Sequence, residues 1–186
     1  MGKKSRTKHH RAPSPRHAAE TPEMASPPTA DTFPPAPLWK RFAAMFYDFL
    51  LVVALSFITT FIYLGAFAAK VGGFDKLKPL IESGATAGDP TLKTALFLVI
   101  FFFFAYFWRR LGQTLGMQVW RIKVVSANGG RLTWVQCILR FFGALLSLAC
   151  FGLGFFWSKW DKNGLTWHDR YAETRVIDLR KAHDHT

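Results

Sequence analysis

Three long apolar blocks, separated by polar segments, dominate the pattern of this sequence. They cover about residues 42–69, 91–110 and 133–157, and within them the apolar residues do not follow the period of a surface helix or strand. A helix over the first block would be roughly 40 Å long, which exceeds the hydrocarbon core of a bilayer, about 30 Å thick. We therefore expect an all-α membrane protein with two transmembrane helices, over 42–69 and 91–110, and a third membrane-embedded segment over 133–157.

The third block is compatible with two topologies. Its uncharged part, residues 141–158, is just long enough to cross the bilayer, and a crossing would place the C-terminus outside. However, the segment that follows is basic, and residues 173–179 have the composition of a strand that would pair most easily with residues 121–125, on the inner side. We favour a re-entrant or interfacial segment over a full span, because broken helices are tolerated where they pack against protein or line a cavity.

The ends of the chain are polar and flank a membrane domain over residues 38–179. Residues 1–37 are rich in Pro, Ala, Ser and Thr, so we expect a disordered tail, and residues 180–186 form a short C-terminal tail. The first tail is basic, and by the positive-inside rule we expect it in the cytoplasm.

Two connecting segments complete the predicted organisation. Residues 70–93 form a polar loop of mixed charge, which suits the outer side of the membrane. On the inner side, residues 119–125 resemble a strand, and an Asn-Gly turn signal follows at Asn128. We expect a short cytoplasmic β-hairpin that pairs this strand with residues 131–133.

The composition excludes several function classes. Half of the 186 residues are hydrophobic and 19 are Phe, which is unusual for a soluble domain. The net charge of +12 lies beside membrane segments, where it sets orientation and attracts anionic lipid head groups, so we expect a lipid bilayer and no nucleic acid as the partner. The first block is longer than the apolar core of a signal peptide, about 7–15 residues, so we expect an uncleaved anchor.

The sequence carries no recognisable catalytic or metal-binding motif. Its two cysteines, Cys137 and Cys150, lie in an apolar block without metal-ligand spacing. His168 and Asp169 invite an acid–base interpretation, but there is no nucleophile in a known motif and no phosphate-binding loop. An Asp and a Thr near a turn more often cap backbone groups. We therefore expect neither an enzyme nor a cofactor.

Four motifs, in order along the chain, point to one family. They are Arg41 and Asp48 in KRFAAMFYD at the start of the first span, the Gly112, Thr114 and Gly116 pattern after the second span, and Asp169 behind His168 in TWHDRYAETRV. Over about residues 37–179 the sequence resembles the RDD family of bacterial membrane proteins, named for one arginine and two aspartates. One departure is Glu173, where members commonly have glycine.

The resemblance implies a multi-pass protein of the bacterial inner membrane, and cation/proton antiport is attributed to some members. If the C-terminal segment is cytoplasmic, Asp169 can approach the first span and form a charged cluster with Arg41 and Asp48, with Arg140 as a fourth member. A partly desolvated carboxylate beside arginines can exchange a proton for a cation. We expect Gly112, Thr114, Gly116 and His168 to be structural.

Two functions remain open from the sequence. The first is transport of small cations or protons through the charged cluster, which would call for a homo-oligomer because so few segments can hardly enclose a pathway. The second is a non-catalytic membrane scaffold or assembly module, in which the charges merely neutralise one another and pin the first span to the C-terminal segment.

Overall fold

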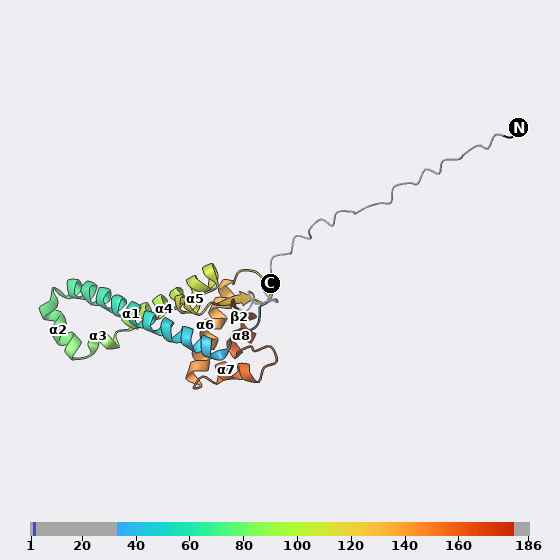
Figure 1. Cartoon of the computed structure of the whole chain (residues 1–186). Helices are drawn as coiled ribbons and strands as arrows, with labels where there is room; N and C mark the ends of the chain where they lie inside the picture. The colour runs from blue at the N-terminus through green and yellow to red at the C-terminus, as the bar shows by residue number, and fades with distance from the viewer. Residues whose placement is uncertain (1, 3–32, 181–186) are drawn as a thin grey trace.

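Two long antiparallel helices form the body of the protein. The computed structural model describes residue 2 and residues 33–180. Helices α1 (Leu38–Val71) and α4 (Pro90–Leu111) lie side by side and are connected at their far end by α2 (Phe74–Glu82) and α3 (Ala85–Gly88) (Figure 1). Both long helices are apolar and long enough to cross a membrane, as predicted. The connection between them was expected to be a loop, but it contains two helices.

A small sheet lies at the other end of this pair. Strands β1 (Ile122–Ser126) and β2 (Thr174–Asp178) run antiparallel, with Ile122 opposite Asp178 and Ser126 opposite Thr174. The pairing of these two segments, distant in sequence, is the one predicted. Short helices flank the sheet: α5 (Leu115–Val119) precedes β1, and α8 (Trp167–Tyr171) precedes β2.

The predicted β-hairpin is wrong, although its turn exists. The amide of Gly129 donates to the carbonyl of Ser126 at 3.0 Å, and Gly129 has a φ of 72°. The chain then enters a helix instead of a second strand, because Thr133 is the N-cap of α6 (Trp134–Ala149) and exchanges side-chain and backbone hydrogen bonds with Gln136. The residues between the turn and this capping box are too few for a paired strand.

The third apolar block forms a sharply bent pair of helices. Helix α6 ends at Ala149, and the chain then continues as α7 (Leu153–Phe156) and the 3₁₀ helix η2 (Trp157–Lys159), at 109° to α6. At about 1.5 Å per residue, α6 is roughly 24 Å long, which is less than the hydrocarbon core. Both α6 and α7 stay at the sheet end of the molecule (Figure 1), which is the shape expected of a re-entrant or interfacial segment.

The segment just before α1 runs alongside β2. The amide of Ala36 donates to the carbonyl of Val176 at 2.8 Å, and the amide of Asp178 donates to the carbonyl of Pro34 at 3.0 Å. Residues 33–37, which we assigned to the disordered tail, are therefore hydrogen-bonded to the sheet. The other predictions for the two tails concern residues 1, 3–32 and 181–186, which lie outside the described residues.

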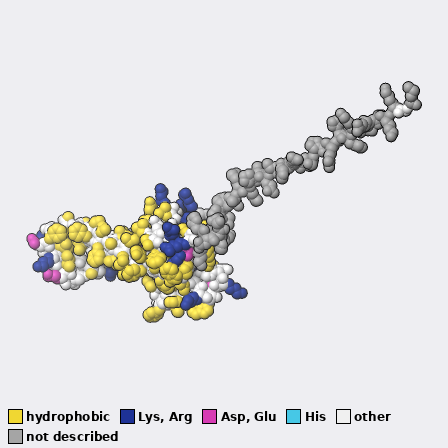
Figure 2. Space-filling model, viewed as in Figure 1, with side chains coloured by type: hydrophobic (Ala, Val, Ile, Leu, Met, Phe, Trp, Pro, Cys, Tyr) yellow, Lys and Arg dark blue, Asp and Glu magenta, His cyan; other side chains and the backbone are white. Residues whose placement is uncertain are grey.

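The surface divides along the length of the molecule. Hydrophobic side chains cover the visible face of the helix pair, whereas most Lys and Arg side chains gather around the sheet end (Figure 2). The buried core lies at that same end, where α1, α4, α5, α6 and the sheet meet; its members include Ala44, Ala105, Met117, Val124 and Cys137. The polar side chains of interest are buried beside this core.

Candidate functional site

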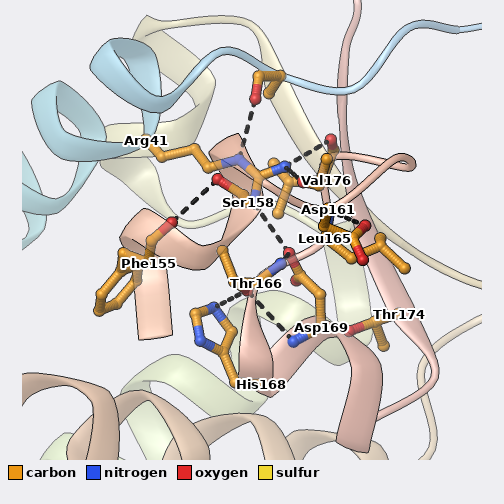
Figure 3. Close-up of polar contacts among 12 residues, drawn as sticks. Arg41, Phe155, Ser158, Asp161, Leu165, Thr166, His168, Asp169, Thr174 and Val176 are labelled. Atoms are coloured by element: carbon orange, nitrogen blue, oxygen red, sulfur yellow. Dashed lines mark hydrogen bonds and ion pairs between the residues drawn. The ribbon is translucent and has the colours of Figure 1, made fainter. Parts of the chain in front are cut away.

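Asp169 is held between two arginines from two other helices. Arg41 on α1 donates through Nη1 to Asp169 Oδ2 at 2.8 Å (Figure 3). Arg140 on α6 donates to the other carboxylate oxygen, Oδ1. All three side chains are buried. We call Arg41, Asp169 and Arg140 the clamp, because these ion pairs fasten α1 and α6 to α8.

Arg41 also binds backbone carbonyls from three segments. Its Nε donates to Ala36 at 3.0 Å, and its Nη2 donates to Gly164 at 3.2 Å and to Val176 at 3.5 Å (Figure 3). The guanidinium has its donors fixed in a rigid fork, which suits several acceptors at once. This one side chain therefore ties the start of α1 to the loop before α8 and to β2.

The sequence around Asp169 forms the N-terminal cap of helix α8. Thr166 is the N-cap of α8, and its Oγ1 accepts the amide of Asp169 at 3.3 Å, while Asp169 Oδ2 accepts the amide of Thr166 at 3.1 Å. This reciprocal pair is a capping box, so the expected capping by a Thr and an Asp is confirmed. Arg140 additionally donates to Thr174 Oγ1 at 3.0 Å.

Burial and the two arginines of the clamp together set the charges of Asp169 and His168. Burial by itself raises the pKa of Asp169, but the charges of Arg140 and Arg41 outweigh it and hold that pKa well below its usual range. Burial lowers the pKa of His168 to about 3, and the positive charges of Arg140 and Arg41 act in the same direction. At neutral pH, Asp169 is therefore ionised and His168 is a neutral imidazole.

Asp48 is not a member of the clamp. It lies two turns deeper on α1 than Arg41, where Thr114 Oγ1 donates to its Oδ2 and the amide of Gly116 donates to its Oδ1 at 2.9 Å. Both partners are neutral, and no ion pair joins Asp48 to any residue in the described part of the chain. The structure thus brings three of the four predicted cluster residues together and leaves Asp48 apart.

The predicted glycine motif is a tight bend that seats α5 against α1. Gly112 ends α4 with a φ of 70°, and its carbonyl accepts the amide of Val124 at 2.7 Å. A Cβ on Gly116 would lie 2.3 Å from the carbonyl oxygen of Ala44, so only glycine permits the contact. Thr114 is the N-cap of α5 and accepts the amide of Met117 at 3.3 Å.

A cavity of about 220 Å³ lies beside these groups, between α1, α4, α5, α6 and α8. Its lining is mostly apolar, but five of the predicted site residues line it: Arg41, Asp48, Thr114, Arg140 and His168. Although Asp48 makes no direct contact with the clamp, it therefore lines the same space. A mainly apolar cavity with a few polar groups is the usual form of a ligand site.

One buried ion pair was missed by sequence reasoning. Lys40 on α1 pairs with Asp178 at the end of β2, and both side chains are buried. The available signal was the alternation of β2, which places Thr174, Val176 and Asp178 on one buried face. In addition, a Cβ on Gly143 would lie 2.8 Å from His168 Cβ, so this glycine lets α8 approach α6.

Comparison with known proteins agrees with the motifs. No solved structure matches this chain. An uncharacterized protein of Bacillus subtilis (strain 168), YxaI, is 30% identical over 148 residues, which cover 77% of this chain and 97% of YxaI. The RDD family matches residues 35–173, a range that includes the whole clamp, Asp48 and the glycine motif. The chain therefore belongs to the RDD family.

Proposed function

We propose that this membrane protein binds and exchanges protons or small cations at Asp48, and that it has no enzymatic role. The observation that carries the proposal is the isolation of this carboxylate. Asp48 is the only acidic residue in the two helices able to span a membrane, it is buried, and its two hydrogen-bond partners, Thr114 and Gly116, are uncharged. A buried carboxylate without a cationic partner needs a proton, a cation or water.

The clamp limits the exchange to Asp48. Both carboxylate oxygens of Asp169 are bonded to arginines, and Oδ2 also accepts the amide of Thr166. Releasing Asp169 to bind a cation would leave two buried arginines uncompensated, at a cost of about 3–5 kcal/mol or more. The proposal therefore has a single exchanging carboxylate, that of Asp48. Arg41, Arg140 and Asp169 have a positioning role.

The test is ion-driven proton flux in liposomes that contain the purified protein. Sodium, potassium and lithium are each imposed against a pH gradient, and the wild type is compared with Asp48→Asn and with Asp75→Asn, an exposed acid on α2. Asn can accept the Gly116 amide as Asp48 does, so the fold is retained. We expect flux in the wild type and in Asp75→Asn and none in Asp48→Asn. Equal flux in all three would place Asp48 outside the pathway.

A second candidate, a non-catalytic assembly module, is favoured by the clamp itself. All charges in the clamp are used to fasten α1 and α6 to α8, and two spanning helices do not enclose a pathway on their own. Chemical cross-linking of the protein in liposomes separates the candidates. A homo-oligomer is expected for transport, whereas a strict monomer without flux for any of the three cations supports the assembly module.

We also propose that the protein is a multi-pass component of the inner membrane with its N-terminus in the cytoplasm. The support is the distribution of charge, because the sheet end carries most of the basic side chains. The opposite end has nearly balanced charges, namely Lys70, Lys76, Lys78 and Lys93 against Asp75, Glu82 and Asp89. By the positive-inside rule the sheet end faces the cytoplasm, next to anionic lipid head groups.

A further inference from the structure

Helix α5 is packed directly against one side of the Asp48 carboxylate. A Cβ on Gly116 would lie 3.0 Å from both Cγ and Oδ1 of Asp48, and 2.3 Å from the carbonyl oxygen of Ala44. The amide of Gly116 donates to Oδ1 at 2.9 Å, and the hydroxyl of Thr114 donates to Oδ2. The backbone of α5 therefore fills this side, and the free space next to the carboxylate is the cavity that Asp48 lines.

The two hydrogen-bond partners of Asp48 suit both of its protonation states. A backbone amide can only donate, so Oδ1 is an acceptor whether or not the carboxyl group carries a proton. A hydroxyl can donate or accept, so Thr114 can turn to accept a hydrogen that Oδ2 carries. Thr114 Oγ1 accepts the amide of Met117 at 3.3 Å, which leaves its second lone pair for this bond. A proton can therefore bind at Oδ2 without separating α5 from α1.

The cavity offers a metal ion few oxygen ligands. Among the described residues that line it, Thr114 is the only one besides Asp48 whose side chain contains an oxygen atom. The backbone carbonyls of the lining residues on α1, α4 and α6 belong to helical hydrogen bonds. A small cation that leaves water needs several oxygens to replace its hydration shell, as the rings of carbonyls in channel filters do. Asp48 and Thr114 do not form such a shell.

Neither water nor charge replaces these ligands. A water molecule in a cavity needs about two to four polar partners, and the lining of this cavity is mostly apolar. The charged or titratable groups that share the lining with Asp48 are Arg41 on α1, Arg140 on α6 and His168 on α8, whereas the described lining residues of α4 and α5 contribute none. The two guanidinium groups repel a metal cation in this space. A proton is bonded to the carboxylate itself and occupies no separate place in the cavity.

We propose that the ion exchanged at Asp48 is the proton, and that sodium, potassium and lithium ions do not bind to this carboxylate. The inference rests on the proposed function and names the substrate of that same site. On uptake, a hydronium ion gives its proton to Oδ2, where an O–H bond forms, and a water molecule is left. On release, a water molecule takes the proton back and the carboxylate is restored. In the flux assay, the effect of Asp48→Asn is then the same with each of the three metal cations.

Infrared spectroscopy of the full-length protein in lipid nanodiscs tests the proposal, because it detects proton binding without ion flux. The carbonyl stretch of protonated carboxyl groups is followed against pH, and the band of Asp48 is the one missing from Asp48→Asn. Thr114→Ser keeps a hydroxyl group and shifts this band through the altered hydrogen bond, which identifies it independently. Asp75→Asn, which removes an exposed acid on α2, is the control. Each titration is repeated at equal ionic strength in chloride salts of sodium, potassium, lithium and the bulky organic cation N-methylglucamine.

We expect the band of Asp48 to titrate with the same midpoint pH in all four salts. A cation that competed with the proton at about ten times its Kd would lower this midpoint by about one pH unit. Such a shift in a metal salt, relative to N-methylglucamine, would overturn the proton-only site and leave exchange at Asp48 standing. If no band of Asp48 titrated in any salt, exchange at Asp48 itself would be overturned, and this inference with it. Circular dichroism and elution volume verify that each variant is folded.

Discussion

At the scale of single residues, the two family aspartates are buried in opposite electrostatic settings. Asp169 is neutralised by Arg41 and Arg140, whereas Asp48 is held only by a hydroxyl and a backbone amide. The first setting stabilises the ionised form and favours a permanent structural role. The second leaves the charge of the carboxylate uncompensated, which suits a group that takes up and releases a cation.

The neutral, buried His168 predicts a loss of stability in mild acid. Its pKa is about 3 in the folded protein and about 6.5 when unfolded, so the stability present above pH 6.5 is lost as the pH falls toward 3. At pH 5 the loss amounts to about 2 kcal/mol. We expect the free energy of unfolding of His168→Gln to change less between pH 7 and pH 5 than that of the wild type, measured by denaturant titration in detergent.

The comparison of the two pH profiles isolates His168, because every other histidine is present in both proteins. Asp169 does not contribute in this window, since its folded pKa is depressed and its stabilisation is lost only below the usual range of a carboxyl. Parallel profiles for the two proteins would mean that the pKa of His168 is the same in the folded and the unfolded protein.

The sequence motifs pointed to buried polar side chains, but they did not show how these side chains pair. The order of motifs identified Arg41, Asp48 and Asp169, but not that α5 would take Asp48 away from the clamp. Glu173 is a similar case: it has a φ of 49°, a left-handed conformation in which glycine is favoured. The departure from the family pattern was visible in the sequence, whereas the left-handed backbone conformation, which favours glycine at this position, was not.

At the scale of elements, close approaches of helices depend on Gly116. A methyl group there would meet the backbone of Ala44 at 2.3 Å and the carboxylate of Asp48 at 3.0 Å, so α5 would have to move off α1. We expect Gly116→Ala to lower the midpoint of thermal unfolding, with a cost of about 1–3 kcal/mol from overpacking. Gly65→Ala is the matched control.

Gly65 lies within α1, and an added methyl group there has nothing within 4 Å. Alanine is the better helix former by about 1 kcal/mol, so this control is expected to leave the midpoint unchanged or to raise it. Equal midpoints for Gly116→Ala and the wild type would show that α5 is not packed against α1 as described.

Element prediction succeeded where one local signal was enough and failed where two competed. The apolar blocks gave the two long helices, and the strand-like residues 174–178 found their partner in β1. The hairpin failed because Thr133 and Gln136 form a capping box, which starts α6 immediately after the turn. Residues 131–133 were predicted to continue the hairpin as a strand, but Thr133 is also the N-cap of α6, and the helix forms instead.

At the scale of the whole molecule, the sheet places both ends of the membrane domain together. Residues 34–36 before α1 and β1 after α4 both hydrogen-bond to β2, which follows the bent pair of α6 and α7. Since this sheet cannot be divided between the two sides of a bilayer, the segments before α1, after α4 and after α7 share one side.

The sequence alone did not decide whether the third block crosses the bilayer or turns back within it. Length and hydropathy do not reveal the 109° bend after α6.

Cysteine accessibility in spheroplasts tests this arrangement. In a background of Cys137→Ala and Cys150→Ala, single cysteines replace three exposed residues: Ser83 between α2 and α3, Asn128 after β1, and Asn163 before α8. We expect a membrane-impermeant maleimide to label Ser83→Cys in intact spheroplasts, and Asn128→Cys and Asn163→Cys only after lysis. Labelling of Asn163→Cys without Asn128→Cys would require the third block to cross the bilayer, and the pairing of β1 with β2, on which the clamp depends, would then be impossible.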